Sequence, residues 1–123
     1  MTLTEVRTEI AAALSAEITA HATLPANPTP PFAAVMWPTR IERLTRLSGA
    51  HTYSIAVEVW VLMTDPTAAQ DALDGYIDTL PSLVEKHTAD WRYALCEDVT
   101  NVRADTIGDA HCLVADLNYT ITA

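Results

Sequence analysis

The sequence predicts a single α+β domain in which two main helices cover a mostly antiparallel sheet of four to five strands, in the order α-β-β-β-α-β-β. Two adjacent segments indicate this class. Residues 51–63 alternate with period two, which is typical of a strand with one buried face. Residues 66–80 then place apolar side chains at helical spacing, so this helix can cover the strand. The buried side of the strand is predicted to hold Tyr53, Ile55, Val57, Val59, Val61 and Met63.

The N-terminal segment is predicted to form a helix over residues 3–20. Thr2 and Glu5 fit a capping box, in which both side chains bond backbone N–H groups at the start of a helix. The apolar stripe of this helix would consist of Val6, Ile10, Ala13, Leu14 and Ile18. Residues 21–31 contain four prolines, so we expect an extended crossing there rather than a helix or a central strand.

Residues 32–46 are predicted to form two strands that Pro38 separates. Residues 32–37 are nearly all apolar, which indicates a short strand buried on both faces. Residues 40–46 are mostly polar. With residues 47–50 as the turn, this second strand is expected to pair with residues 51–63 in a hairpin.

Start and stop signals frame the second helix. Asp65 can cap the unpaired amides at its start, and Pro66 suits the first helical position, where a missing N–H group is harmless. Pro81 is expected to break the helix. Residues 82–89 would then form a short helical extension.

The C-terminal third is predicted to be a hairpin of residues 91–103 and 111–121 around a turn at Gly108 and Asp109. The alternation of the first strand is interrupted at residues 97–98, which indicates a bulge. The last strand would face inward with Leu113, Ala115, Leu117, Tyr119 and Ile121.

The two cysteines are predicted to be free thiols. The turn near Gly108 would place Cys96 opposite Tyr119 or Thr120 and therefore away from Cys112. A disulfide between the two arms of the hairpin would then have poor geometry.

Composition limits the classes of function. The chain has 123 residues, of which half are hydrophobic, and one domain of this size can build a core. The net charge of −9 argues against a protein that grips nucleic acid by its phosphates, although an acidic wall suits a protein that lets DNA pass. The apolar runs are too short to span a bilayer, and the N-terminal residues lack the features of a signal peptide. We therefore expect assembly in the cytoplasm and no membrane partner.

The sequence contains no pattern that indicates catalysis. The four histidines are scattered without the spacing of a zinc site, and the three glycines form no phosphate-binding loop. No orienting group or oxyanion turn accompanies either cysteine. We therefore expect no catalytic residues, no metal and no cofactor, and we predict that the protein is not an enzyme.

Candidate functional residues lie instead on surfaces that another subunit can contact. Three basic residues in a predicted hairpin could meet an acidic neighbour or could simply be solvated edge residues: Arg40, Arg43 and Arg46. Three acidic residues on one side of the second helix could face a neighbour or a channel, or could be a solvated helix face: Asp71, Asp74 and Asp78.

Trp60 is a further interface candidate. It lies on the strand face opposite to Val57, Val59 and Val61, with Ala56 and Leu62 beside it. This second apolar face is expected to need a cover, either a further helix or another subunit.

Nearly the whole chain, taken in order, resembles the tail terminator proteins of long, non-contractile-tailed phages, especially those that infect actinobacteria. The resemblance consists of the helix of residues 4–14, the Pro-rich crossing into residues 31–35, the hairpin strand, the helix of residues 68–76 and the closing strands. The length of the Pro-rich segment and Pro81 depart from the family pattern.

This resemblance implies a structural virion protein at the head–tail junction. Such a protein forms a homohexameric ring that caps the finished tail tube and provides the surface that joins the head. Its partners would be other copies of itself, the tail tube protein and a head–tail connector or neck protein, while DNA passes through the lumen without specific binding. The alternatives are a neck or head–tail completion protein and a small metabolite-binding α+β domain.

Overall fold

The computed structural model describes residues 1–44 and 49–123 and confirms the predicted α+β class and the order α-β-β-β-α-β-β. The elements are α1 (Leu3–Leu14), β1 (Thr19–His21), β2 (Phe32–Arg43), β3 (His51–Leu62), α2 (Pro66–Lys86), β4 (Tyr93–Ile107) and β5 (Ala110–Thr122). The strands form one five-stranded sheet in the order β1-β2-β3-β5-β4. Only the pair β1–β2 is parallel, so the sheet is mostly antiparallel, as predicted.

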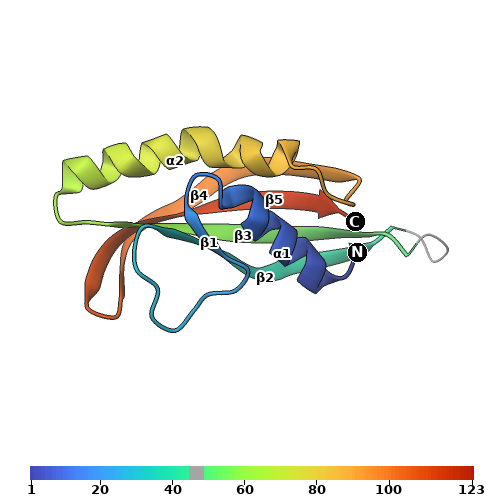
Figure 1. Cartoon of the computed structure of the whole chain (residues 1–123), viewed down its shortest axis with the longest axis horizontal. Helices are drawn as coiled ribbons and strands as arrows, with labels where there is room; N and C mark the ends of the chain where they lie inside the picture. Colours follow the sequence, from blue (N-terminus) through green and yellow to red (C-terminus); the bar gives the residue numbers. More distant parts are fainter. Residues whose placement is uncertain (45–48) are drawn as a thin grey trace.

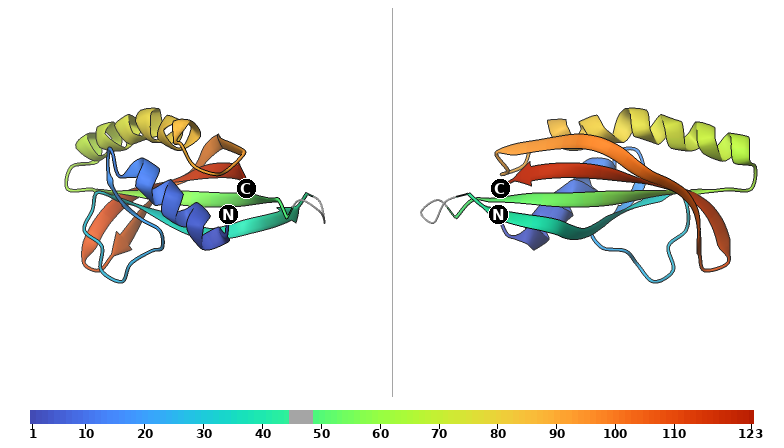
Figure 2. Two further views of the ribbon diagram at one scale, coloured as in Figure 1. Left: turned by 45° about the vertical axis from the view of Figure 1, so that its right-hand side comes forward. Right: turned by 180° about the vertical axis from the view of Figure 1, so that it is seen from behind.

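The two helices lie on the same face of the sheet (Figures 1 and 2). α1 packs beside β1 and β2, and α2 runs along β3, β5 and β4. The long strands twist strongly, and the turn between β4 and β5 curls away from the helical layer (Figure 1). The molecule is therefore an elongated two-layer domain with one covered and one uncovered sheet face.

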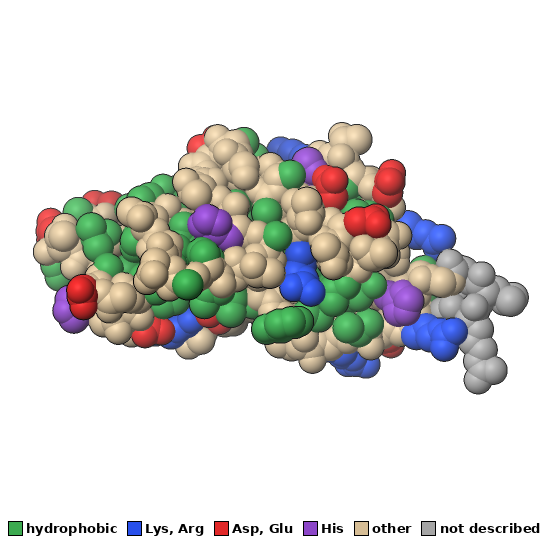
Figure 3. Space-filling model, turned by 60° about the horizontal axis from the view of Figure 1, so that its bottom comes forward, with side chains coloured by type: hydrophobic (Ala, Val, Ile, Leu, Met, Phe, Trp, Pro, Cys, Tyr) green, Lys and Arg blue, Asp and Glu red, His purple; other side chains and the backbone are tan. Residues whose placement is uncertain are grey.

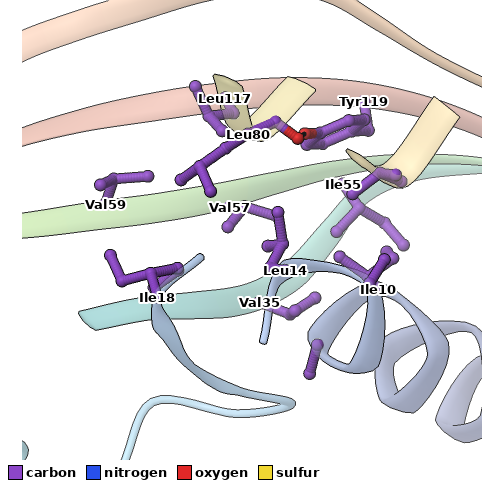
Figure 4. Close-up of a cluster of buried hydrophobic side chains, with 14 of the residues drawn as sticks. Ile10, Leu14, Ile18, Val35, Ile55, Val57, Val59, Leu80, Leu117 and Tyr119 are labelled. Carbon is purple, nitrogen blue, oxygen red and sulfur yellow. Dashed lines mark hydrogen bonds between the residues drawn. The ribbon is translucent and has the colours of Figure 1, made fainter. Parts of the chain in front are cut away.

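The main core lies between the helices and the sheet. Figure 4 shows Ile10 and Leu14 of α1 pointing toward Val35, Ile55 and Val57 of the sheet. The alternation in β3 is confirmed, because its odd-numbered residues from Tyr53 to Val61 are buried, and Met63, just after the strand, packs against the same cluster. At the α2 side the buried hydroxyl of Tyr119 donates a hydrogen bond to the Leu80 carbonyl at 3.4 Å.

The first helix is shorter than predicted. Thr2 caps it as expected, since its side chain accepts a hydrogen bond from the Glu5 N–H at 3.2 Å. The helix ends at Leu14, where the N–H of Ser15 bonds the Ala11 carbonyl, and residues 19–21 form the strand β1 instead. The exposed backbone of β2 provides hydrogen-bond partners for that segment, which helical periodicity alone does not reveal.

Both predicted proline breaks are wrong. β2 continues through Pro38, so the two predicted strands are one, and the register shifts on either side of Pro38 accommodate its missing N–H group. α2 likewise runs through Pro81. Pro81 removes one helical hydrogen bond, but Leu80 and Val84 on either side of it are completely buried, and this packing outweighs the loss.

The C-terminal hairpin follows the prediction with longer strands. The bulge at residues 97–98 is confirmed by the register shift between Cys96 and Asp98. A second irregularity lies between Thr100 and Arg103, where Asn101 has a φ of 57°. Cys96 lies opposite Tyr119, and both cysteines are free, as predicted. Of the predicted inward residues of β5, Leu113 is only half-buried and the other four are buried.

Candidate assembly surface

Trp60 is the centre of a small apolar cluster on the face of the sheet opposite to the helices. Its indole ring stacks on the ring of Phe32 in the neighbouring strand, with the centroids 5.7 Å apart and the planes at 11°. Ala34 of β2 together with Cys112 and Val114 of β5 complete the buried cluster, and its edge is formed by partly buried residues, namely Met36, Ile107 and Ala110.

The chain itself buries Trp60, which is only 5% exposed. The expectation that a further helix or another subunit must cover this face at Trp60 is therefore wrong. Sequence reasoning missed the cover because it comes from neighbours in the same sheet. Phe32 and Val114 flank the indole from the two adjoining strands, and the curled hairpin of β4 and β5 supplies Ile107.

A charged cluster borders the apolar one. The Arg103 guanidinium donates to Glu58 Oε2 at 2.9 Å and to Asp116 Oδ1 at 3.1 Å, and Glu58 also accepts the indole N–H of Trp60 at 3.1 Å. Burial lowers the pKa of Arg103, but the hydrogen bond and charge of Asp116, together with Glu58, raise it above its ordinary value. The cluster thus holds a fixed cation between two carboxylates on three adjacent strands, and no local pattern in the sequence indicated it.

The predicted basic hairpin is exposed where the structure describes it. The Arg40 side chain is 72% exposed and lies 3.9 Å from the Glu42 carboxylate, and Arg43 is also exposed. Register places Arg40 opposite Ser54 and Arg43 opposite His51, so the two arginines point to opposite faces of the sheet. Arg46 lies outside the described residues.

The predicted acidic stripe is also exposed. Asp71 and Asp74 lie in the first half of α2 and Asp78 lies just past its middle, and α2 starts at the end of the molecule opposite to the Arg43 end of β2 (Figures 1 and 2). Of the three arginines the structure describes Arg40 and Arg43, and it does not bring these two together with the aspartates within one protomer. Each set is available to a different molecule.

An exposed apolar strip along β2 was not predicted. Trp37 is 74% exposed, and the Arg7 guanidinium lies 5.0 Å from the centre of its ring, in the range of a cation–π contact. Ile41 and Leu44 are about half exposed on the same strand and just after it. Figure 3 shows hydrophobic side chains gathered beside basic ones on this side of the molecule. The only hint of this strip in the sequence was that Trp37 stands directly before Pro38, since proline in a sheet is typical of an edge strand.

The described residues offer little for catalysis. None of them form a group of three or more metal-ligating side chains. Burial, with the charges of Glu85 and Asp98, raises the pKa of Cys96 to about 11, so this thiol is protonated at neutral pH and is a weak nucleophile. A shallow hollow of about 650 Å³ is lined by Pro25 and residues 27–31 of the Pro-rich crossing, by residues 17–19, and by His21 and Tyr76. No described helix is long and apolar enough to cross a membrane.

The fold and the surfaces define the chain as a two-layer α+β domain with exposed charged side chains on β2 and α2 and an exposed strand edge. Comparison of the chain with protein-family models and with curated proteins finds no match.

Proposed function

We propose that the protein is a structural subunit that closes into a ring, of the kind that terminates the tail tube of a long, non-contractile-tailed phage and presents the surface for head joining. The ring would contain copies of this chain in head-to-tail contact, and its partners would be the tail tube protein and a connector or neck protein. In this role the protein is not an enzyme and carries no cofactor.

The separation of the two candidate charge sets, one on β2 and the other on α2, carries this proposal. Arg40 and Arg43 lie in the last part of β2, toward one end of the molecule, whereas the stripe of Asp71, Asp74 and Asp78 runs along α2, which starts at the other end, to just past the middle of the helix. A head-to-tail contact places unlike ends together, and such heterologous contacts close into rings when the rotation permits. Opposite charges across the contact would fix its register.

The strength of this contact would come from repetition. An exposed ion pair is worth at most about 1 kcal/mol. In a closed ring, the same pairs recur at every subunit boundary. The net charge of −9 also suits a lumen through which DNA passes, because an acidic wall repels phosphate.

Charge reversal tests the proposal. The Arg40→Glu/Arg43→Glu variant should retain the fold, because both side chains are exposed, and should lose ring formation in the presence of the tail tube protein. The matched control is Arg92→Glu, an exposed arginine just before β4. Mass photometry gives the stoichiometry, and electron microscopy gives the length of tubes assembled with each variant.

A compensating variant makes the test sharper. Adding Asp71→Lys/Asp74→Lys/Asp78→Lys to the reversed arginines should restore the ring, since the charges are exchanged across the same contact. If the arginine variant forms rings and limits tube length as the wild type does, the arginines are only solvated strand residues and the proposed contact is wrong.

A further inference from the structure

The outer edge of β2 is open over residues 38–44. β1 pairs only with residues 32–34 of β2, and within the described ranges no strand pairs with the later part of this edge. This segment, which we call the open edge, runs beyond α1 toward the end of the molecule (Figure 1). Unpaired strand edges are templates for pairing with another chain.

The backbone groups that face outward on the open edge follow from the pairing with β3. The Leu44 N–H donates to the Ala50 carbonyl at 3.1 Å, and this ladder continues through the pairs of Glu42 with Thr52 and of Arg40 with Ser54. Because backbone groups alternate in direction along a strand, the N–H and C=O groups of Ile41 and Arg43 point away from β3. They are available to a further strand.

The opposite edge of the sheet is protected against the same kind of pairing. β4 contains two register shifts, which bend the strand. The outward N–H of Cys96 donates to Glu85 Oε2 of α2 at 3.0 Å, and the N–H of Thr106 donates to Asp105 Oδ1 at 2.8 Å. β2 also has register shifts on either side of Pro38, but its pairing with β3 is regular from Arg40 to Arg43. A second copy therefore finds a regular partner edge in this last part of β2 rather than in β4.

We infer that the open edge pairs with the open edge of a second copy, antiparallel, about a two-fold axis that passes through Ile41. In this register Ile41 faces its own symmetry mate, Arg40 faces Glu42 of the second copy, and Glu42 faces Arg40. Like edges meet in such an isologous contact, so the segment must be complementary to itself. The sequence Arg40-Ile41-Glu42 has this property.

The side chains fit this register on both faces of the sheet. Arg40 and Glu42 lie on the same face, lie 3.9 Å apart and are 72% and 55% exposed, so the second copy can add its own pair to form an alternating group of four charges. Ile41 lies on the other face, where it is 52% exposed and would be covered by its mate. The central pair exchanges two backbone hydrogen bonds through the outward groups of Ile41.

The helices leave room for this contact. α1 touches β2 ahead of the open edge, through Val35 in the core and through the stacking of Arg7 on Trp37. The two-fold axis at Ile41 therefore places the two α1 helices on opposite sides of the contact. The resulting assembly is a continuous ten-stranded sheet made from two five-stranded ones.

This inference goes beyond the proposed ring and does not rest on it, because a two-fold contact differs from a head-to-tail contact. Its test uses the purified full chain alone. Sedimentation velocity over a concentration series should show a monomer–dimer equilibrium for the wild type. Glu42→Arg should raise the dissociation constant of the dimer by about tenfold or more, because two like-charged pairs replace two opposite ones.

A charge exchange and a matched control complete the design. Arg40→Glu/Glu42→Arg should restore dimerisation to near the wild-type level, since the exchanged segment is again complementary to itself. Ile41→Lys should prevent dimerisation, whereas Val102→Lys, at a similarly exposed position on the protected edge, should not. Circular dichroism melting should confirm that each variant is folded.

The outcomes separate this inference from the proposed ring. A wild type that stays monomeric at all concentrations overturns the two-fold contact, as does an exchanged variant that is as weak as Glu42→Arg. A wild type that forms only larger closed rings, unaffected by Glu42→Arg, overturns it while favouring the head-to-tail contact. Dimers that respond to all three changes as expected support it, whatever the ring experiment shows.

Discussion

Replacing Trp60 with alanine tests whether this residue belongs to the core of one chain or to an interface. The indole is 5% exposed and stacks on Phe32, so the substitution removes a large buried ring and leaves a cavity in the cluster with Val114 and Cys112. If Trp60 is a core residue, the loss should appear as instability of the isolated monomer.

The size of the effect can be worked out from the packing. Burying an aromatic ring removes roughly 150–250 Å² from water, which at about 25 cal/mol per Å² gives about 4–6 kcal/mol as an upper value. Measured substitutions of buried Phe or Trp by Ala lower stability by about 3–5 kcal/mol. Loss of the bond from the indole to Glu58 adds little, because Glu58 keeps its bond to Arg103. We therefore expect about 4 kcal/mol, or a melting temperature lower by roughly 15 °C.

The assay is urea unfolding of Trp60→Ala and of a matched control, Trp37→Ala. Trp37 is 74% exposed and contributes a cation–π contact with Arg7, so its substitution should lower the free energy of unfolding by about 1 kcal/mol or less. Equal effects of the two substitutions, or a Trp60→Ala variant that stays stable yet fails to assemble, would refute the core assignment.

Three further predictions concern the ion pairs of Arg103, the Asp65 helix cap and the Cys96 thiol. Arg103→Met leaves the carboxylates of Glu58 and Asp116 without their cation, although these side chains are only 15% and 17% exposed. The substitution should therefore lower the free energy of unfolding, measured by urea titration, by about 2–4 kcal/mol. Adding Glu58→Gln/Asp116→Asn should recover part of this loss. Asp65→Ala removes the acceptor of the Thr67 N–H and should destabilise by about 1 kcal/mol in thermal melts, while Asp65→Asn should retain most of the stability. Alkylation should find two free thiols per unfolded chain, and for Cys96 in the folded protein it should accelerate with pH up to about 11, against 9.0 for an ordinary thiol. Because folding raises the pKa of Cys96, the folded state favours the protonated thiol. The contribution of this thiol to the stability of the protein should be complete below pH 9.0 and lost as the pH rises through about 11. An inflection of the alkylation rate near pH 9.0 would contradict the burial of this thiol.

The sequence by itself determined the elements whose signals are local. The alternation of β3, the Thr2 and Asp65 caps and the bulge near residue 97 depend on side chains within a few positions of one another, and the structure confirms all four. The same local reasoning placed Cys96 opposite Tyr119, because a single turn fixes the register of a hairpin.

Tertiary structure decided the outcome where local and distant preferences compete. Prolines normally end helices and strands, yet buried Leu80 and Val84 hold α2 together across Pro81, and β3 holds β2 in register across Pro38. The first helix ends before the predicted residue 20, and residues 19–21 instead pair with residues 32–34 of β2. The sequence of residues 19–21 does not indicate this pairing.

The candidate surfaces divide in the same way. The exposure of Arg40, Arg43 and the acidic stripe follows from charge, which keeps such side chains in water whatever the topology. The burial of Trp60 and the ion pairs of Arg103 depend on which strands are neighbours, and Arg103 and Glu58 are 45 residues apart in the chain. Likewise, only the strand order shows that β2 leaves an open edge and that β4 is protected. Side-chain periodicity is a property of short segments and can be recognised in the sequence. The burial of a side chain by neighbouring strands and the position of an unpaired strand edge depend on pairing between distant segments, so only the structure shows them.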